Sequence, residues 1–99
     1  MHARILTVDM GPGMRDEGFA MAERWFAAVA TLPGFVDVTF FGDEERGVYG
    51  YFSLWETREA AEAAGEAVGP QLNEAIARQM VRPPQVRIFE VYRPRESSN

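Results

Sequence analysis

The side chains in this sequence best suited to chemistry are an acid and two aromatic residues placed in alternating, strand-like segments. A phenol can donate a proton where nearby charge lowers its pKa, an indole can stack on an aromatic ligand, and a desolvated carboxylate can act as a base. Asp9, Tyr51 and Trp55 are therefore the candidate catalytic residues. Each also has a structural interpretation: Asp9 as a strand-end carboxylate with an Arg partner, Tyr51 as an interface residue and Trp55 as part of the core.

Large apolar side chains form a second set, suited to the wall of a pocket between helices and a sheet. The candidate ligand-binding residues are Trp25, Phe26, Phe40 and Phe52. The same side chains can equally fill that space as ordinary core, and the sequence leaves both interpretations open.

The sequence contains little that predicts a metal or a cofactor. It has no Cys, and its one His, His2, lies near the start of the chain. The consecutive acids over 43–45 lack the alternating ligands of a calcium loop, and Gly11-x-Gly13 lacks the strand-to-helix context of a phosphate-binding loop. We expect no metal site and no bound cofactor.

The charge balance of the sequence disfavours two classes of binding partner. The 99 residues carry 10 basic and 15 acidic side chains, for a net charge of -5, which disfavours nucleic acid and anionic membranes as partners. All the basic residues are Arg, a bias typical of GC-rich bacterial genomes. The first residues lead directly into an apolar strand without a leader segment, and no apolar run could span a membrane, so we expect a cytoplasmic protein.

Hydrophobic periodicity predicts six elements. Alternation predicts strands, and spacings of three and four predict helices with one apolar stripe, formed in the first helix by Phe19, Ala22, Phe26 and Val29. Leu32-Pro33-Gly34 ends that helix, Thr57 is a candidate N-cap for the second, and Gly69-Pro70 predicts a break within it. The predicted strands cover 3–10, 35–41, 48–55 and 85–92, and the predicted helices cover 14–31 and 57–80.

This order, βαββαβ, is that of a ferredoxin-like α+β fold. Right-handed crossovers place both helices on one face of a four-stranded antiparallel sheet, with the first and third strands in the middle. We expect one domain over 1–93 and a polar C-terminal tail over 94–99.

The alternation also predicts the two faces of the sheet. The face under the helices is expected to carry Leu6, Val8, Met10, Val36, Val38, Phe40, Phe52 and Leu54. The open face is expected to carry Ile5, Thr7, Phe35, Thr39, Phe41, Tyr49, Tyr51 and Trp55. So many aromatic side chains would form a large exposed patch, and a second copy packing on this face, to give a dimeric α+β barrel, is the simplest way to cover it.

Several segments together resemble the antibiotic biosynthesis monooxygenase group of dimeric α+β barrel proteins, over nearly the whole chain. They are Leu32-Pro33-Gly34-Phe35, the acidic turn, the aromatic strand ending in the run 55–60 (WETREA), and Pro83-Pro84-Gln85-Val86. The resemblance implies a homodimer. It also implies one of several activities found in that group, including cofactor-independent oxygenation of polyketide-like aromatics, haem degradation and quinol oxidation.

The resemblance carries over unevenly to individual residues. Haem-degrading members use an Asn in the first strand and a Trp and a His on the second helix. On the corresponding face of the second predicted helix, this chain has Ala63, Ala64 and Val68. Haem degradation is therefore disfavoured. Two function classes remain: a small monooxygenase-like protein acting without metal on an aromatic or polyketide-type substrate, or a non-catalytic dimer that binds a small apolar ligand or a partner. The first predicts a pocket with at least two converging polar groups, and the second predicts a collapsed or wholly apolar cavity.

Overall fold

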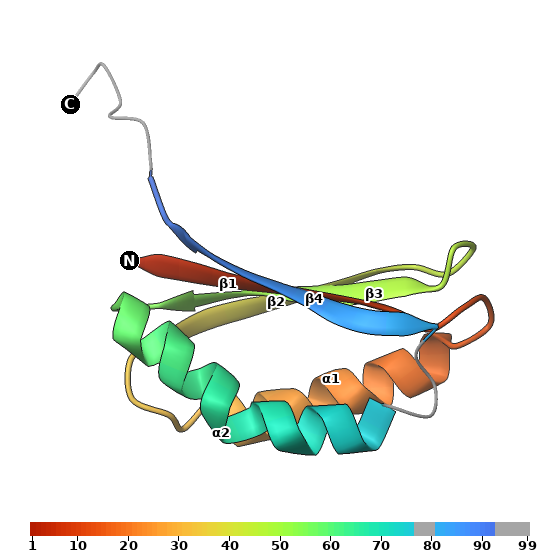
Figure 1. Ribbon diagram of the computed structural model, residues 1–99, viewed down its shortest axis with the longest axis horizontal. Helices are drawn as coiled ribbons and strands as arrows, with labels where there is room; N and C mark the ends of the chain where they lie inside the picture. Colours follow the sequence, from red (N-terminus) through yellow and green to blue (C-terminus); the bar gives the residue numbers. More distant parts are fainter. Residues whose placement is uncertain (77–80, 93–99) are drawn as a thin grey trace.

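The computed structural model describes residues 1–76 and 81–92. Its elements are β1 (His2–Asp9), α1 (Arg15–Val29), β2 (Phe35–Asp43), β3 (Val48–Trp55), α2 (Arg58–Ile76) and β4 (Arg82–Glu90). The strands form one antiparallel sheet in the order β2-β3-β1-β4. Both helices lie on one face of it, as Figure 1 shows. The predicted ferredoxin-like α+β arrangement, with the first and third strands in the centre, is confirmed. The predicted tail over 94–99 lies outside the described residues.

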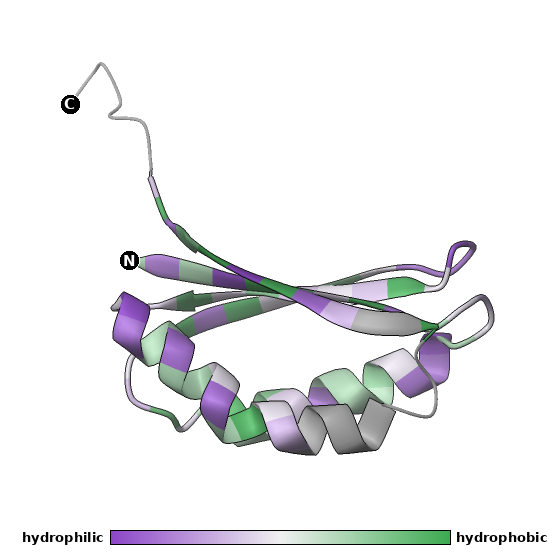
Figure 2. Ribbon diagram, viewed as in Figure 1, coloured by the Kyte–Doolittle hydropathy of each residue, from purple (hydrophilic) through white to green (hydrophobic). Residues whose placement is uncertain are grey.

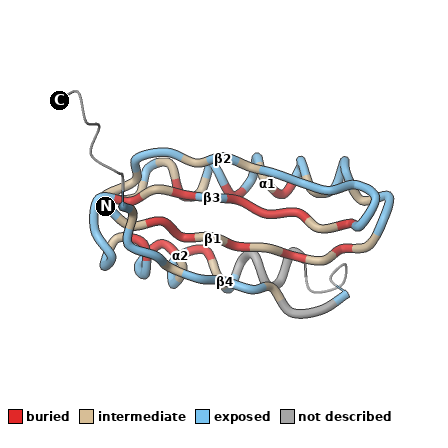
Figure 3. The backbone as a smooth tube through the Cα atoms, turned by 90° about the horizontal axis from the view of Figure 1, so that it is seen from above, coloured by how far each residue is buried: buried red, intermediate tan, exposed pale blue. Residues whose placement is uncertain are grey.

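Burial follows the position of each strand in the sheet. Figure 3 shows buried residues concentrated along the central strands β1 and β3, while β2 and β4 at the edges are mostly exposed. Figure 2 shows hydrophilic residues at the turn between β2 and β3, along the helices and on parts of β1 and β4. Within the described part of the chain, no helix is both long enough and apolar enough to cross a membrane.

The corner between α1, β2 and α2 depends on two local features. Gly34 adopts a positive φ of 83°, and a Cβ there would lie 2.6 Å from the Cβ of Ala60, so only glycine fits this close approach. The Thr57 hydroxyl accepts a hydrogen bond of 3.0 Å from the backbone N–H of Ala60, which confirms Thr57 as the N-cap of α2. The close approach of Gly34 to Ala60 holds the start of β2 against the first turn of α2.

The predicted apolar stripe of α1 is wrong in part. The residues that α1 buries are Met21, Trp25 and Val29, whereas Phe19 and Phe26 are about half exposed. Both sets recur at helical spacing, and they lie on adjacent sides of the helix. Contact with the sheet selects the side that carries Trp25, which is not part of the predicted stripe.

The predicted break at Gly69-Pro70 is also wrong, because α2 continues through Pro70 as one helix. Figure 1 shows that its axis bends along its length, as expected where a proline removes one backbone hydrogen bond. Ala61, Ala64 and Val68 form the buried side of the first part of α2.

The two faces of the sheet differ from the prediction at β3. Leu6 is paired with Tyr51 and Val8 with Tyr49, and direct cross-strand partners project to the same face. Tyr49, Tyr51 and Trp55 therefore lie under the helices and are buried, while Phe52 lies on the open face and is 37% exposed. Alternation shows which residues of one strand share a face, but it does not show which face lies under the helices. A one-residue change of register turns all side chains of a strand to the opposite face relative to its neighbour.

β2 shows a smaller departure for a related reason. Its register with β3 shifts between Phe35 and Asp37, so Phe35 pairs with Trp55 and belongs to the covered side. Val36, predicted to be covered, is exposed. A bulge inserts one extra residue and re-aims the side chains on either side of it.

Candidate functional site

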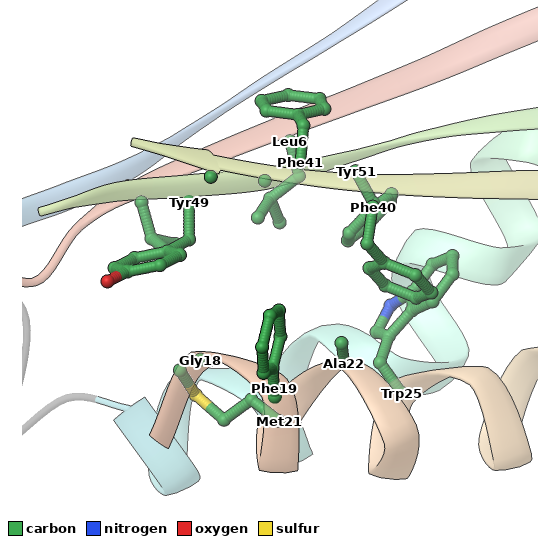
Figure 4. A pocket seen from close by; sticks show the side chains of 13 residues that line it. Leu6, Gly18, Phe19, Met21, Ala22, Trp25, Phe40, Phe41, Tyr49 and Tyr51 are labelled. Carbon is green, nitrogen blue, oxygen red and sulfur yellow. The ribbon is translucent and has the colours of Figure 1, made fainter. Parts of the chain in front are cut away.

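A cavity of about 170 Å³ lies between the first half of α1 and the strands β1, β2 and β3. Figure 4 shows side chains from α1 facing those of the sheet across this space, while the Phe41 ring lies on the other side of the sheet. The lining residues are Leu6, Val8, Gly18, Phe19, Met21, Ala22, Trp25, Phe40, Phe41, Gly42, Tyr49, Gly50 and Tyr51. The lining is overwhelmingly apolar, which suits an apolar ligand.

Three aromatic rings form one wall of the cavity. The Trp25 ring stacks on Tyr51, with centroids 3.8 Å apart and planes at 30°. Phe40 meets both rings edge-on, at 5.9 Å from Trp25 and 6.0 Å from Tyr51. Each ring is held by the other two, so the wall is rigid and presents flat aromatic surface to a ligand.

The opposite end of the cavity is formed by Tyr49, held between two glycines. A Cβ at Gly18 would lie 3.1 Å from the Tyr49 ring, and a Cβ at Gly42 would lie 2.6 Å from it. The missing side chains at these two positions create a slot that the ring occupies. This slot determines where the Tyr49 hydroxyl lies.

Two polar atoms of the lining residues are buried without a hydrogen bond of acceptable geometry within the described structure: the Tyr49 hydroxyl and the Trp25 Nε1. The Trp25 N–H nevertheless lies close enough to the Tyr51 hydroxyl to help lower the pKa of that phenol. In Figure 4 the indole nitrogen lies on the side of the Trp25 ring that faces the other lining side chains. The Tyr49 hydroxyl points away from those side chains in the same view. A buried polar group left unpaired costs about 1–3 kcal/mol, so a ligand oxygen that accepts a hydrogen bond from the Trp25 N–H would recover that energy.

The Tyr51 hydroxyl is oriented by Arg4. Arg4 is only 5% exposed, its Nη1 donates a hydrogen bond to the Tyr51 hydroxyl, and its Cζ lies 5.7 Å from the Tyr51 ring centroid. A Cβ at Gly65 of α2 would lie 3.1 Å from the guanidinium, so glycine makes room for it. Among the described residues, no carboxylate forms an ion pair with Arg4.

Burial raises the pKa of the Tyr51 phenol to about 12, although the Arg4 guanidinium and the Trp25 N–H lower that pKa part of the way. Tyr51 is therefore neutral at physiological pH and can donate a proton or a hydrogen bond, but it cannot act as a general base. Of the three candidate catalytic residues, it is the one that lines the cavity.

Trp55 lies outside the cavity lining and is fully buried. Its Nε1 donates to the Ser53 hydroxyl at 3.0 Å, and that hydroxyl donates to the backbone carbonyl of Arg4 at 3.0 Å. Phe35 packs edge-on against the ring at 5.5 Å. These contacts match the structural interpretation of Trp55 as a core residue.

Asp9 lies at the end of β1, outside the cavity lining, and its Oδ1 accepts a hydrogen bond from the Gly11 N–H at 3.2 Å. Of the ligand-binding candidates, Trp25 and Phe40 line the cavity. Phe26 instead packs against Phe35, at 6.2 Å between centroids. The placement of Phe52 between the helices and the sheet is wrong, because it lies on the open face.

The sequence analysis did not identify Arg4 as a site residue, and alternation predicted the wrong face of the sheet for Tyr49. An Arg inside an apolar strand is a signal that could have been used, because a charged side chain there must be paired or turned outward. The close packing of Gly18 and Gly42 on Tyr49 gave no signal, because the three positions meet only in the folded chain.

The groups that line the cavity determine what chemistry it can support. No lining residue carries a carboxylate, an imidazole or an amine, so the described lining has no side chain suited to act as a base at neutral pH. Within the described residues, no three His, Cys, Asp or Glu side chains are grouped so that they could hold a metal ion. The cavity can bind, orient and exclude water from an aromatic molecule.

No family model matches the sequence, and no curated protein matches it. Solved structures do match. A proposed antibiotic biosynthesis monooxygenase from Nitrosomonas europaea is similar with a TM-score of 0.77 at 15% identity, covering 94% of this chain and 91% of the other. Another from Caulobacter crescentus gives 0.75 at 19% identity, covering 93% and 90%.

SnoaB, a cofactor-independent oxygenase from Streptomyces nogalater, gives a TM-score of 0.72 at 18% identity, covering 94% of this chain and 93% of the other. At these identities the likeness concerns the fold, and the activities belong to the proteins named. The chain therefore has the fold of the antibiotic biosynthesis monooxygenase-like structures, which confirms the resemblance identified from its sequence.

Proposed function

We propose that this protein is a small monooxygenase-like protein that acts without metal on an aromatic or polyketide-type substrate. The observation that supports the proposal most directly is the aromatic cavity bordered by the Trp25 N–H, which makes no hydrogen bond of acceptable geometry within the described structure. The likeness in fold to a cofactor-independent oxygenase agrees with it.

In the proposed reaction the substrate itself reduces dioxygen. A ring CH₂ group activated by a neighbouring phenol or carbonyl loses a proton, and the resulting carbanion transfers electrons to O₂. One oxygen atom becomes a carbonyl oxygen on that carbon and the other leaves as water, so both hydrogens of the CH₂ group end in water. The protein stacks the ring on Trp25, donates a hydrogen bond from Trp25 Nε1 to a substrate oxygen, and excludes bulk water. Because the described lining has no base, the substrate must ionise readily by itself.

Oxygen consumption tests this function. We expect purified protein to accelerate O₂ uptake by anthrone-like phenols above the rate in buffer, without loss of activity in EDTA. Replacing Trp25 by Phe keeps a ring in the wall but removes the N–H donor, and should lower the rate about 10–100-fold, within the range of a lost transition-state donor. Val36→Ala, an exposed change outside the cavity lining, is the matched control. No acceleration by any member of the panel would contradict the proposal.

A non-catalytic role in binding small aromatic molecules is the second candidate, and the lack of a base in the described lining favours it. It predicts saturable binding of the same phenols together with O₂ uptake no faster than in buffer. Isothermal titration of a phenol that shows no turnover distinguishes the two.

We further propose a cytoplasmic homodimer that forms through the open face of the sheet. That face carries the exposed rings of Phe41, Phe52 and Phe89 beside Ile5, in place of the tyrosines predicted there. A second copy would bury these rings. Light scattering at micromolar concentration tests the dimer, and Phe52→Asp should convert it to monomer.

A further inference from the structure

The cavity can enclose one ring of a fused aromatic molecule, but not the whole of it. Its volume of about 170 Å³ is close to the volume of about 150 Å³ that binds benzene in a protein interior, and well below the roughly 300–1,000 Å³ of pockets for larger ligands. A polycyclic substrate of the proposed reaction must therefore leave its remaining rings outside the cavity. The residues at the opening contact those rings.

The Trp25 N–H indicates which ring enters. This buried donor borders the cavity and makes no hydrogen bond of acceptable geometry within the described structure. A phenol oxygen on a terminal ring can accept from it only when that ring is the one enclosed. The neighbouring ring, which carries the CH₂ group, then lies nearer the opening, where dioxygen can reach it.

Phe19 lies at the opening. Its side chain lines the cavity and is nevertheless 52% exposed, and the exposed Gly42 lines the cavity on the side of β2. Figure 4 shows the Phe19 ring projecting from α1 toward the sheet, apart from the rings of Trp25 and Phe40. The Arg15 guanidinium lies over the Phe19 ring, 4.9 Å from its centroid, and restrains it through a cation–π contact. Such a contact occupies one face of the ring and leaves the other for a ligand.

A second half-exposed phenylalanine of α1, Phe26, provides a comparison. Phe26 is 46% exposed, but its ring packs edge-on against Phe35 at 6.2 Å between centroids and does not line the cavity. Phe19 has no aromatic partner among the described residues. A ring held at the opening of an apolar cavity is suited to stack on a flat molecule that projects from it, because offset rings attract each other beyond the effect of burial.

We propose that Phe19 is a specificity-determining residue whose ring stacks on the substrate rings that remain outside the cavity, so that the protein prefers fused polycyclic phenols to single-ring phenols. This inference rests on the proposed function and names a residue that selects its substrate. Because the stacking contact involves ring faces and not the reacting CH₂ group, Phe19 contributes to substrate binding and not to the chemical step.

Two phenols that lack a ring CH₂ group test the preference: p-cresol and 1-hydroxyanthraquinone. The first has a single ring, and the second is a fused polycycle whose central ring already carries the carbonyl oxygen that the reaction would introduce. Ligand-observed NMR measures binding of p-cresol, and quenching of tryptophan fluorescence measures binding of 1-hydroxyanthraquinone. We expect the polycyclic phenol to bind the unmodified protein at least about 10-fold more tightly.

The variant Phe19→Ala should weaken binding of 1-hydroxyanthraquinone about 10-fold and change binding of p-cresol by about 3-fold or less. Phe19→Tyr keeps a ring at the opening and should preserve the preference. The matched control Phe26→Ala removes the same ring from a similarly exposed position outside the cavity lining, and should change neither affinity by more than about 2-fold. Circular dichroism establishes that each variant is folded.

Oxygen uptake with an anthrone-like phenol separates binding from chemistry. Phe19→Ala should raise KM about 10-fold and leave kcat within about 2-fold, because stacking on the outer rings is equally strong in the ground state and in the transition state. Trp25→Phe, which removes the donor to the substrate oxygen, should lower kcat instead. A loss of kcat with unchanged KM in Phe19→Ala would overturn the inference.

Equal affinity of the unmodified protein for the two phenols, or an equal loss of 1-hydroxyanthraquinone binding in Phe19→Ala and Phe26→Ala, would also overturn the role of Phe19. These binding measurements require no turnover, so neither result bears on the proposed oxygenase activity. A preference that depends on Phe19, found together with no acceleration of O₂ uptake, would support the inference and contradict the oxygenase. The protein would then bind polycyclic phenols without oxidising them.

Discussion

The two tryptophans of this chain, Trp25 on α1 and Trp55 on β3, both pack on the covered side of the sheet but differ in their hydrogen bonding. Trp55 is fully buried and its N–H is paired with Ser53, which is itself paired with the backbone of Arg4. Trp25 is also buried, but its N–H makes no hydrogen bond of acceptable geometry within the described structure, and its ring borders a cavity. Two equally buried indoles can therefore differ in whether their hydrogen-bonding capacity is met, and burial alone does not distinguish them.

We expect the largest effect on the free energy of unfolding when Trp55 is truncated. Trp55→Ala removes a completely enclosed ring and should lower the free energy of unfolding by about 3–5 kcal/mol. Urea denaturation followed by circular dichroism measures the change. A loss below about 1 kcal/mol would mean that the Trp55 region is not the packed counterpart described here.

The next effect concerns pH and Tyr51, which joins the two regions through Trp25 and Arg4. Burial raises the pKa of Tyr51 from its ordinary value of 10.0 to about 12, so the fold favours the neutral phenol. The associated stability is complete below pH 10 and is lost as the pH rises toward 12, by about 2–3 kcal/mol in all.

Urea unfolding at pH 8, 10 and 11.5 should show this loss, and Tyr51→Phe should flatten it. Tyr92→Phe, which alters an exposed tyrosine, is the matched control and should leave the pH dependence intact. An unchanged slope in Tyr51→Phe would show that another group titrates.

The smallest effect compares the two indole N–H groups directly. Ser53→Ala leaves the buried Trp55 N–H without an acceptor and should cost about 1–3 kcal/mol of stability. Trp25→Phe and Trp55→Phe remove the same ring volume from buried positions, but only Trp55→Phe also removes the donor to the Ser53 hydroxyl, so it should cost more by about 0.5–1.5 kcal/mol. Urea denaturation of the two variants measures the difference, and an equal or larger loss in Trp25→Phe would contradict the distinction between the two indole N–H groups.

Much of the fold could be predicted from local features. The strand from 48 to 55 has the predicted bounds, and Thr57 caps the second helix as expected. Gly34 adopts a positive φ in the turn after the first helix, a backbone conformation that glycine favours over other residues. Helix propensity could not show that Pro70 would remain inside α2, because packing against the sheet outweighs one missing hydrogen bond.

The candidate site was less predictable. Trp25, Phe40 and Tyr51 were identified as candidates by residue type, and the structure brings them together in one wall. Arg4 was not identified, and its guanidinium meets Tyr51 across strands that are 47 residues apart in sequence. Side chains from distant segments meet only once the strand register is established.

The order of the elements and the turns between them can be predicted from the sequence, because periodicity, capping and turn chemistry act over a few neighbouring residues. The resemblance to the antibiotic biosynthesis monooxygenase group could also be identified from the sequence. The tertiary structure decided which face of β3 is covered. Pairing Leu6 with Tyr51 instead of its neighbour Phe52 turns two tyrosines and a tryptophan under the helices and leaves Phe52 on the open face. That choice depends on the summed packing of both central strands against α1 and α2, which no single strand's alternation contains.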